Sequence, residues 1–248
     1  MTWNPLIVSI VVLVVWTIIT LGGEIWQAGS REALQKLVSD SLVYCLVAAA
    51  LFLLAVVAYL GWWRQVGLLP GDTASNFKML ILPALGVVAI WVVAFSRGLK
   101  TASFGVLGIN TLLVGFSEEL MFRGVLFHGV QAELGSIRAV VITALLFGSV
   151  HALNGFITGD RTRAVEQAGM TVLFGFWIGA VRLYMSTLYP LMIIHWLWDL
   201  GLFVAAPAEK PPPAEMARAG KALLIPPGVA IVLFVYGLYL LYAHSGRH

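Results

Sequence analysis

Two adjacent glutamates and an arginine interrupt an apolar stretch in the middle of the chain. Glu118 and Glu119 follow a run of apolar residues, Arg123 lies four residues further on, and apolar residues then resume. In a helix, Glu119 and Arg123 are i,i+4 neighbours and can form an ion pair, whereas Glu118 points about 100° away and lacks such a partner. Charges in apolar helices are kept where they pair, line a cavity or take part in chemistry. Glu118 is therefore a candidate general base, with a carboxylate that only packs between helices as the alternative.

Three further polar side chains lie in later apolar stretches. His151 is near the end of one stretch, and His195 and Asp199 lie four residues apart in another. At that spacing His195 and Asp199 share a helix face, so the carboxylate can orient the imidazole. A carboxylate base and two imidazoles can activate water and stabilise the oxyanion that forms at a peptide carbonyl. For His195 and Asp199, a pair that only makes hydrogen bonds between helices is the alternative.

The same groups also allow a metal site. Glu118, His151 and His195 are residue types that bind zinc in hydrolytic enzymes. However, the sequence lacks the H-E-x-x-H spacing, and these ligands would come from three separate helices. We therefore expect no cofactor, and keep a divalent metal such as zinc as the alternative.

The composition predicts a protein that lies in a membrane. Of its 248 residues, 60% are hydrophobic and 11% are charged, against about 25% charged in an average soluble domain. Such a chain cannot cover a water-facing surface, so we expect lipid as its surroundings. The net charge is only +3 and Lys and Arg do not cluster, which argues against a nucleic-acid partner. The first five residues contain no Lys or Arg, so the first apolar stretch is expected to be a retained helix rather than a signal peptide.

Eight stretches are apolar enough for helices that span a bilayer, which need about 20 residues. They cover residues 6–21, 42–62, 79–95, 104–133, 137–153, 168–185, 189–206 and 223–242. Residues 24–40, 154–166 and 207–214 are more polar or proline-rich and are expected to connect them. The predicted fold is thus all-α: one domain, residues 1–248, forming a polytopic bundle of about eight transmembrane helices with a polar cavity inside the membrane.

Some details of this arrangement also follow from the sequence. The fourth stretch is expected to be tilted or bent near Gly124. The distribution of Lys and Arg among the loops places both termini on the outer side of the membrane by the positive-inside rule. Arg182 is expected to reach towards the membrane surface, and His128 is expected at that surface without a catalytic role.

The three polar clusters together form a known pattern. Residues 118–123 match a Glu-Glu-x-x-x-Arg motif, residues 147–151 a Phe-x-x-x-His motif, and residues 195–199 a His-x-x-x-Asn/Asp motif. In their order and spacing they resemble the CPBP (ABI) family of intramembrane proteases, which includes the type II CAAX prenyl endopeptidases and bacteriocin-processing enzymes. The resemblance covers a motif core of about residues 104–200.

This resemblance implies an intramembrane peptidase with its site in a cavity open to one leaflet. It implies that Glu118 activates water together with His151, and that Glu119 and Arg123 form a supporting ion pair. His195 and residue 199 would form the oxyanion site. The prenyl endopeptidases have Asn at the last position, and Asn can donate a hydrogen bond, whereas the ionised carboxylate of Asp199 cannot. Asp199 can instead hold His195 as a cation that donates.

The sequence therefore predicts an intramembrane endopeptidase that cleaves a membrane-associated peptide or protein, prenylated or not. We expect it in the bacterial cytoplasmic membrane. Two alternatives remain at this point. One is a non-catalytic immunity or scaffold protein of the membrane, and the other is a transporter in which the carboxylates relay protons. The hydrolase hypothesis requires Glu118 to lie close to both His151 and His195.

Overall fold

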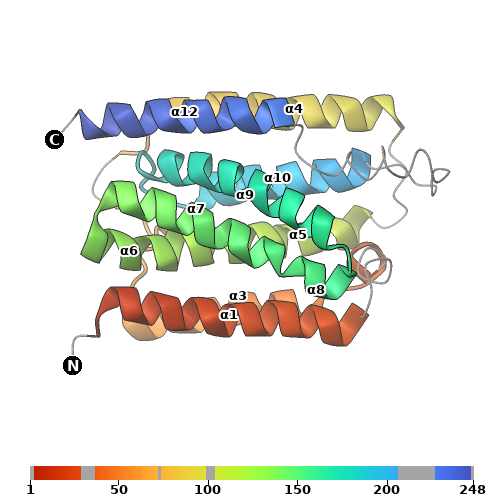
Figure 1. Ribbon diagram of the computed structural model, residues 1–248, viewed down its shortest axis with the longest axis horizontal. Coiled ribbons are helices and arrows are strands. Elements are labelled where there is room, and N and C mark those ends of the chain that lie inside the picture. Colours follow the sequence, from red (N-terminus) through yellow and green to blue (C-terminus); the bar gives the residue numbers. More distant parts are fainter. Residues whose placement is uncertain (1–2, 29–36, 72–73, 99–103, 206–226, 247–248) are drawn as a thin grey trace.

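The computed structural model describes residues 3–28, 37–71, 74–98, 104–205 and 227–246, which form helices and turns without a strand. Figure 1 shows the helices running side by side in rows. One edge of the bundle is formed by α1 (Pro5–Ala28) and α3 (Tyr44–Leu60), and the opposite edge by α4 (Ile81–Ser96) and α12 (Pro227–Ser245). The start of α1 and the end of α12 lie at the same end of the bundle.

The central helices carry the polar motifs. They are α5 (Phe104–Glu119), the π-helix η2 (Leu120–Leu126), α6 (Phe127–Leu134), α7 (Ser136–Ala152), α8 (Asn154–Thr158), α9 (Arg161–Arg182) and α10 (Tyr189–Ala205). A short 3-10 turn, η1 (Phe77–Leu80), precedes α4. Helix α9 packs against α7 and α12, and α10 packs against α4 and α5. The motif helices thus pack against one another and against the outer ones.

Six helical segments of the described residues are long and apolar enough to cross a membrane, namely Pro5–Gln27, Phe77–Ser96, Phe104–Leu134, Ser136–Phe156, Arg161–Arg182 and Gly228–Ser245. Two shorter apolar helices, Tyr44–Leu60 and Tyr189–Ala205, complete the set of eight stretches found in the sequence. The prediction of an all-α polytopic bundle is therefore confirmed.

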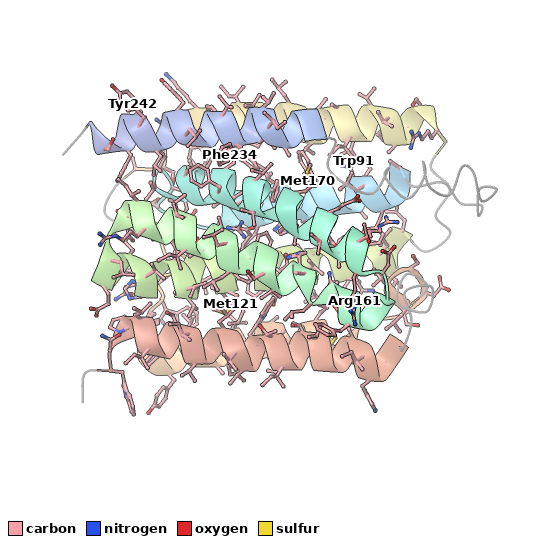
Figure 2. The ribbon with its side chains drawn as sticks, in the orientation of Figure 1. Trp91, Met121, Arg161, Met170, Phe234 and Tyr242 are labelled. Carbon is pink, nitrogen blue, oxygen red and sulfur yellow. The ribbon has the colours of Figure 1, made fainter. Side chains whose placement is uncertain are left out.

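Large apolar side chains lie on the outer faces as well as in the interior. Tyr242, labelled in Figure 2, projects outward from α12 and is 80% exposed, whereas Met121 is fully buried in the middle of the bundle. Ile18 on α1 and Val92 on α4 are also exposed. Exposed apolar surface on this scale is unfavourable in water. It suits helices whose outer faces meet lipid chains.

Two predicted boundaries are wrong. Residues 24–40 were expected to leave the first helix, but α1 continues to Ala28 and includes Glu24. Residues 154–166 were expected to form a loop, but they contain α8 and the start of α9. Gly159 ends α8 in the left-handed conformation (φ 71°), and the Asp160 carboxylate then accepts a hydrogen bond from the backbone N–H of Arg163 at 3.0 Å. Gly159 thus ends α8 and Asp160 caps the start of α9, so two residues are enough to separate the two helices.

The bend expected near Gly124 is a π-helix. All seven residues of η2 are buried. A π-helix contains an extra residue per turn and disturbs the regular backbone hydrogen bonds. Arg182 Nε donates to the carbonyl oxygen of Arg123, within η2, at 3.1 Å, and its Nη1 donates to that of Met185, just beyond α9, at 2.6 Å. Arg182 is the last residue of its apolar span and is half-buried, so its reach towards the membrane surface stays a prediction.

The close approach of α5 and α10 depends on Gly115. A Cβ atom at this position would lie 3.0 Å from the backbone nitrogen of Trp196 and 3.2 Å from the carbonyl oxygen of Met192. Both are backbone atoms on α10 and cannot rotate away. Since Gly115 lies one helical turn before Glu119 and Met192 one turn before His195, this contact sets the distance between the two polar motifs.

We expect Gly115→Ala to destabilise the protein by roughly 1–3 kcal/mol, the usual range for overpacking. Gly108→Ala on the same helix is the matched control, because a Cβ there would meet nothing within 4 Å, and alanine is the better helix former. The two variants should change the unfolding midpoint in detergent in opposite directions. A Gly115→Ala protein as stable as the control would contradict this account of the α5–α10 contact.

Candidate active site

The end of α5 places Glu118 between two imidazoles from different helices. Its Oε2 lies 3.6 Å from Nε2 of His195 on α10, and its Oε1 lies 4.0 Å from Nε2 of His151 on α7. Glu118 is mostly buried, with 16% of its side chain exposed. The three residues are 33 or more positions apart in the sequence. The structure thus brings Glu118 close to both histidines, as the hydrolase hypothesis requires.

His195 is surrounded by three carboxylates. Its Nδ1 lies 2.8 Å from Oε1 of Glu119, and its Nε2 lies 3.4 Å from Oδ2 of Asp199. Glu118 is the third carboxylate, and the ring itself is buried. Because carboxylates accept hydrogen bonds, Nδ1 is best placed as an N–H that donates to Glu119. The orientation of the ring is therefore fixed from both sides.

Glu119 and Arg123 form a buried ion pair beneath His195. Arg123 Nη1 lies 3.2 Å from Glu119 Oε1, and the two side chains are 1% and 0% exposed. The guanidinium carbon of Arg123 is 4.3 Å from the centre of the Phe147 ring, a cation–π contact. The arginine therefore neutralises the carboxylate that holds His195, and Phe147, which begins the second motif, packs over the arginine.

The tautomer of His151 follows from its own helix. Its Nδ1 lies 2.9 Å from the carbonyl oxygen of Phe147, one helical turn earlier. A carbonyl oxygen can only accept, so Nδ1 carries the hydrogen and Nε2 is directed at Glu118. Phe147 also packs edge-on against the His151 ring at 4.7 Å. The spacing of the Phe-x-x-x-His motif thus serves to orient the imidazole.

A cavity of about 140 Å³ lies beside Glu118 and His151. It has room for a few water molecules, each of which takes about 30 Å³ in the liquid. Its lining comes from α1, α3, α5, α7 and α8, and consists of Trp16, Thr20, Leu21, Glu24, Leu46, Val114, Ser117, Glu118, Val150, His151 and Asn154. The cavity therefore reaches from the middle of the membrane spans towards the end of α1, where α8 also lies (Figure 1).

The sequence analysis missed the contribution of α1 to this cavity. Trp16, Thr20 and Glu24 are spaced four residues apart and form a stripe along one face of the helix. The indole N–H of Trp16 donates to the hydroxyl of Ser117 at 2.7 Å, which fixes this stripe against α5. A polar residue every fourth position in an apolar helix was the signal that could have revealed it.

The metal alternative depends on which nitrogen and oxygen atoms of these side chains face one another. Among the described residues, no group of three or more His, Cys, Asp or Glu side chains has the arrangement of a metal site. Both nitrogens of His195 face carboxylates, and Nδ1 of His151 faces a carbonyl oxygen, which leaves Nε2 of His151 as the available imidazole nitrogen. The absence of a metal cofactor therefore stays a prediction.

His128 lies apart from these motifs, on α6, which follows the π-helix. It packs edge-on against Trp62 with ring centres 4.7 Å apart. This aromatic contact accounts for the residue without a catalytic role.

Part of the chain matches a known protein family. Residues 100–201 match the family described as type II CAAX prenyl endopeptidase Rce1-like. The match contains all six polar residues of the three motifs. The match covers less than half of the chain, so the chain is similar to this family over its motif core, where the polar motifs lie. Six helices among the described residues are long and apolar enough to cross a membrane, which indicates an integral membrane protein.

A second similarity concerns a transporter. The chain is also 25% identical over 202 residues to dipeptide and tripeptide permease A of Proteus mirabilis (strain HI4320). The alignment covers 75% of this chain but 40% of the permease, so the chain spans less than half the length of that relative.

Proposed function

We propose that this Rce1-like protein is an intramembrane endopeptidase that hydrolyses a peptide bond of a membrane-associated peptide or protein. The observation that supports this proposal is the position of Glu118, which faces His151 and His195 from separate helices beside a cavity with room for water. We further propose that the protein acts in the bacterial cytoplasmic membrane and that its substrates include lipid-modified peptides such as prenylated ones.

In the proposed mechanism, Glu118 and His151 activate water. The 4.0 Å between Glu118 Oε1 and His151 Nε2 is too long for a direct hydrogen bond, but a water molecule can bridge it. Glu118 takes a proton from this water as the hydroxide attacks the carbonyl carbon of the substrate. The C–N bond then breaks, and the proton passes from Glu118 to the leaving amine.

His195 is placed to stabilise the oxyanion formed by that attack. With Nδ1 donating to Glu119, a proton on Nε2 is available on the side that faces Glu118 and Asp199. A donor that points at the developing charge lowers the barrier of acyl transfer. In this proposal Asp199 acts through His195, holding it as an imidazolium.

Position 199 is Asp in this chain and Asn in the prenyl endopeptidases, and substitutions there test whether Asp199 acts through His195. We expect Asp199→Ala to lower kcat by about 10²-fold, at the lower end of the effect of removing an oxyanion donor, because His195 loses the carboxylate 3.4 Å from its Nε2. Asp199→Asn should stay within about ten-fold of wild type, since the amide can accept from His195 or donate to the oxyanion itself. Equal activity of Asp199→Ala and wild type would exclude this role.

The proposed function is tested with purified protein in detergent or vesicles. A fluorogenic peptide with a prenylated cysteine and the same peptide without the prenyl group are incubated with wild type, Glu118→Ala and His151→Ala, each with and without a chelator. We expect cleavage by wild type, insensitive to chelator, and none by either variant. Full activity in either variant would defeat the mechanism, and loss of wild-type activity with chelator, restored by zinc, would replace it with the metal alternative.

The permease similarity makes transport the second candidate function. A transporter that uses these carboxylates to relay protons would accumulate a dipeptide in vesicles in response to a pH gradient. We expect no such uptake, because Glu118 is gathered with His151 and His195 at one point, as a catalytic base requires. An immunity or scaffold role would leave the cellular phenotype intact in Glu118→Ala.

A further inference from the structure

Among the described residues that line the cavity, Glu24 is the charged one that the proposed chemistry does not use. It lies on α1, two helical turns beyond Trp16, and lines the cavity together with Glu118. Glu24 makes no hydrogen bond or ion pair with another residue of the described part of the chain. The stripe on α1 thus presents a carboxylate to the cavity in addition to the proposed base.

Among the residues that the structure describes, the rest of the lining offers no fixed positive charge. Its described members include no Lys or Arg, and the remaining polar side chains are Thr20, Ser117, His151 and Asn154. Two carboxylates in an otherwise apolar, partly enclosed space repel each other, and this repulsion is stronger than in water because the local dielectric is low. An occupant with a positive charge relieves it. The charge of the cavity therefore favours a cationic group over a neutral or acidic one.

The size and lining indicate which kind of cation fits. The cavity volume of about 140 Å³ suits an alkylammonium group, such as a lysine side chain. Trp16 lines the same space, and tryptophan is the aromatic residue that interacts best with organic cations.

We propose that Glu24 is a specificity-determining residue that binds a positively charged group of the substrate, a lysine side chain or a free amino group, close to the bond that Glu118 attacks. This inference rests on the proposed peptidase function, because it assigns the substrate that the same cavity accepts. It predicts a preference for basic peptides that depends on α1 rather than on the three motifs.

The test uses pairs of peptides that differ in one charge. Starting from a peptide that wild type cleaves, each residue next to the mapped bond is replaced in turn by lysine or by norleucine, its uncharged counterpart. We expect wild type to prefer lysine at one position by about ten-fold or more in kcat/KM, as for a hydrogen bond to a charged group. Glu24→Gln should bring the ratio close to one, and Glu24→Lys should favour a glutamate peptide at that position.

Glu166→Gln is the matched control. Glu166 is an exposed carboxylate on α9, outside the cavity lining, so its removal changes the net charge equally without changing the cavity. This variant should keep the lysine preference. Because each ratio compares two peptides on the same protein, a partly unfolded preparation does not alter it. A lysine preference that survives Glu24→Gln, or its absence from wild type at every position, would overturn the assignment.

A binding measurement separates this inference from the proposed function. If wild type cleaves neither peptide, the peptidase proposal fails, but the labelled lysine and norleucine peptides can still be titrated against wild type and Glu24→Gln. Tighter binding of the lysine peptide that disappears in Glu24→Gln would retain Glu24 as a cation-binding residue. Equal affinities of wild type for the two peptides would reject it. If Glu24→Gln cleaves too slowly to assay, the titration with the two labelled peptides decides whether Glu24 binds the lysine side chain.

Discussion

Replacing Glu118 by glutamine is expected to lower kcat by about 10³-fold, the middle of the range for loss of a general base. Glutamine has nearly the same shape, so the contacts with His195 at 3.6 Å and His151 at 4.0 Å can be kept in some form. It cannot accept the proton of the attacking water. Since substrate binding is unaffected in this proposal, KM should change little, which is the pattern of an interaction made in the transition state.

The measurement is steady-state cleavage of the best peptide substrate, with the thermal unfolding midpoint as a check on folding. Glu166→Gln serves as control here as well, because it removes an exposed carboxylate from α9. We expect this control to cleave like wild type. If Glu118→Gln folds normally and keeps more than a tenth of the wild-type activity, Glu118 is not the general base. If the variant instead lost stability, Glu118 would have to be regarded as a packing carboxylate.

Much of this site could be predicted because charged residues stand out in apolar helices. Glu118, His151 and His195 lie in three separate apolar stretches, and each was expected near the others before their distances were known. Their spacing also predicted which side chains share a helix face, and Glu119 and Arg123 do pair at 3.2 Å. The roles of these residues in catalysis stay predictions, as does the division of the chain into one domain.

The parts that were missed depend on contacts between distant segments. Glu24 was assigned to a polar connection because charge follows soon after the first apolar run, yet the helix continues because its polar face meets a cavity rather than lipid. A bend near Gly124 was expected, but neither its form as a π-helix nor the hydrogen bond from Arg182, 59 residues further along, to the carbonyl oxygen of Arg123 was predicted. Local sequence patterns contain no information about the cavity that α1 faces or about the contact between Arg182 and Arg123.

Replacing Arg123 by methionine is expected to lower the free energy of unfolding by about 3–5 kcal/mol. The arginine is 1% exposed and lies 3.2 Å from Glu119, which is fully buried. Methionine fills a similar volume but leaves Glu119 with His195 as its remaining partner. Unfolding in detergent micelles measures the change, and Arg138→Met is the control, because Arg138 is exposed on α7 and such surface changes usually stay within about 0.5 kcal/mol.

A second substitution then separates stability from chemistry at the same pair. Adding Glu119→Leu to Arg123→Met removes the unpaired carboxylate, and replacing both members of a buried ion pair by apolar groups is often neutral. We therefore expect the double variant to recover most of the lost stability. It should still be inactive, because His195 loses the carboxylate that lies 2.8 Å from its Nδ1 and no longer has a fixed orientation. A double variant that recovers both stability and cleavage would show that Glu119 supports the fold alone, whereas one that recovers neither would show that the two side chains act through more than their mutual charge.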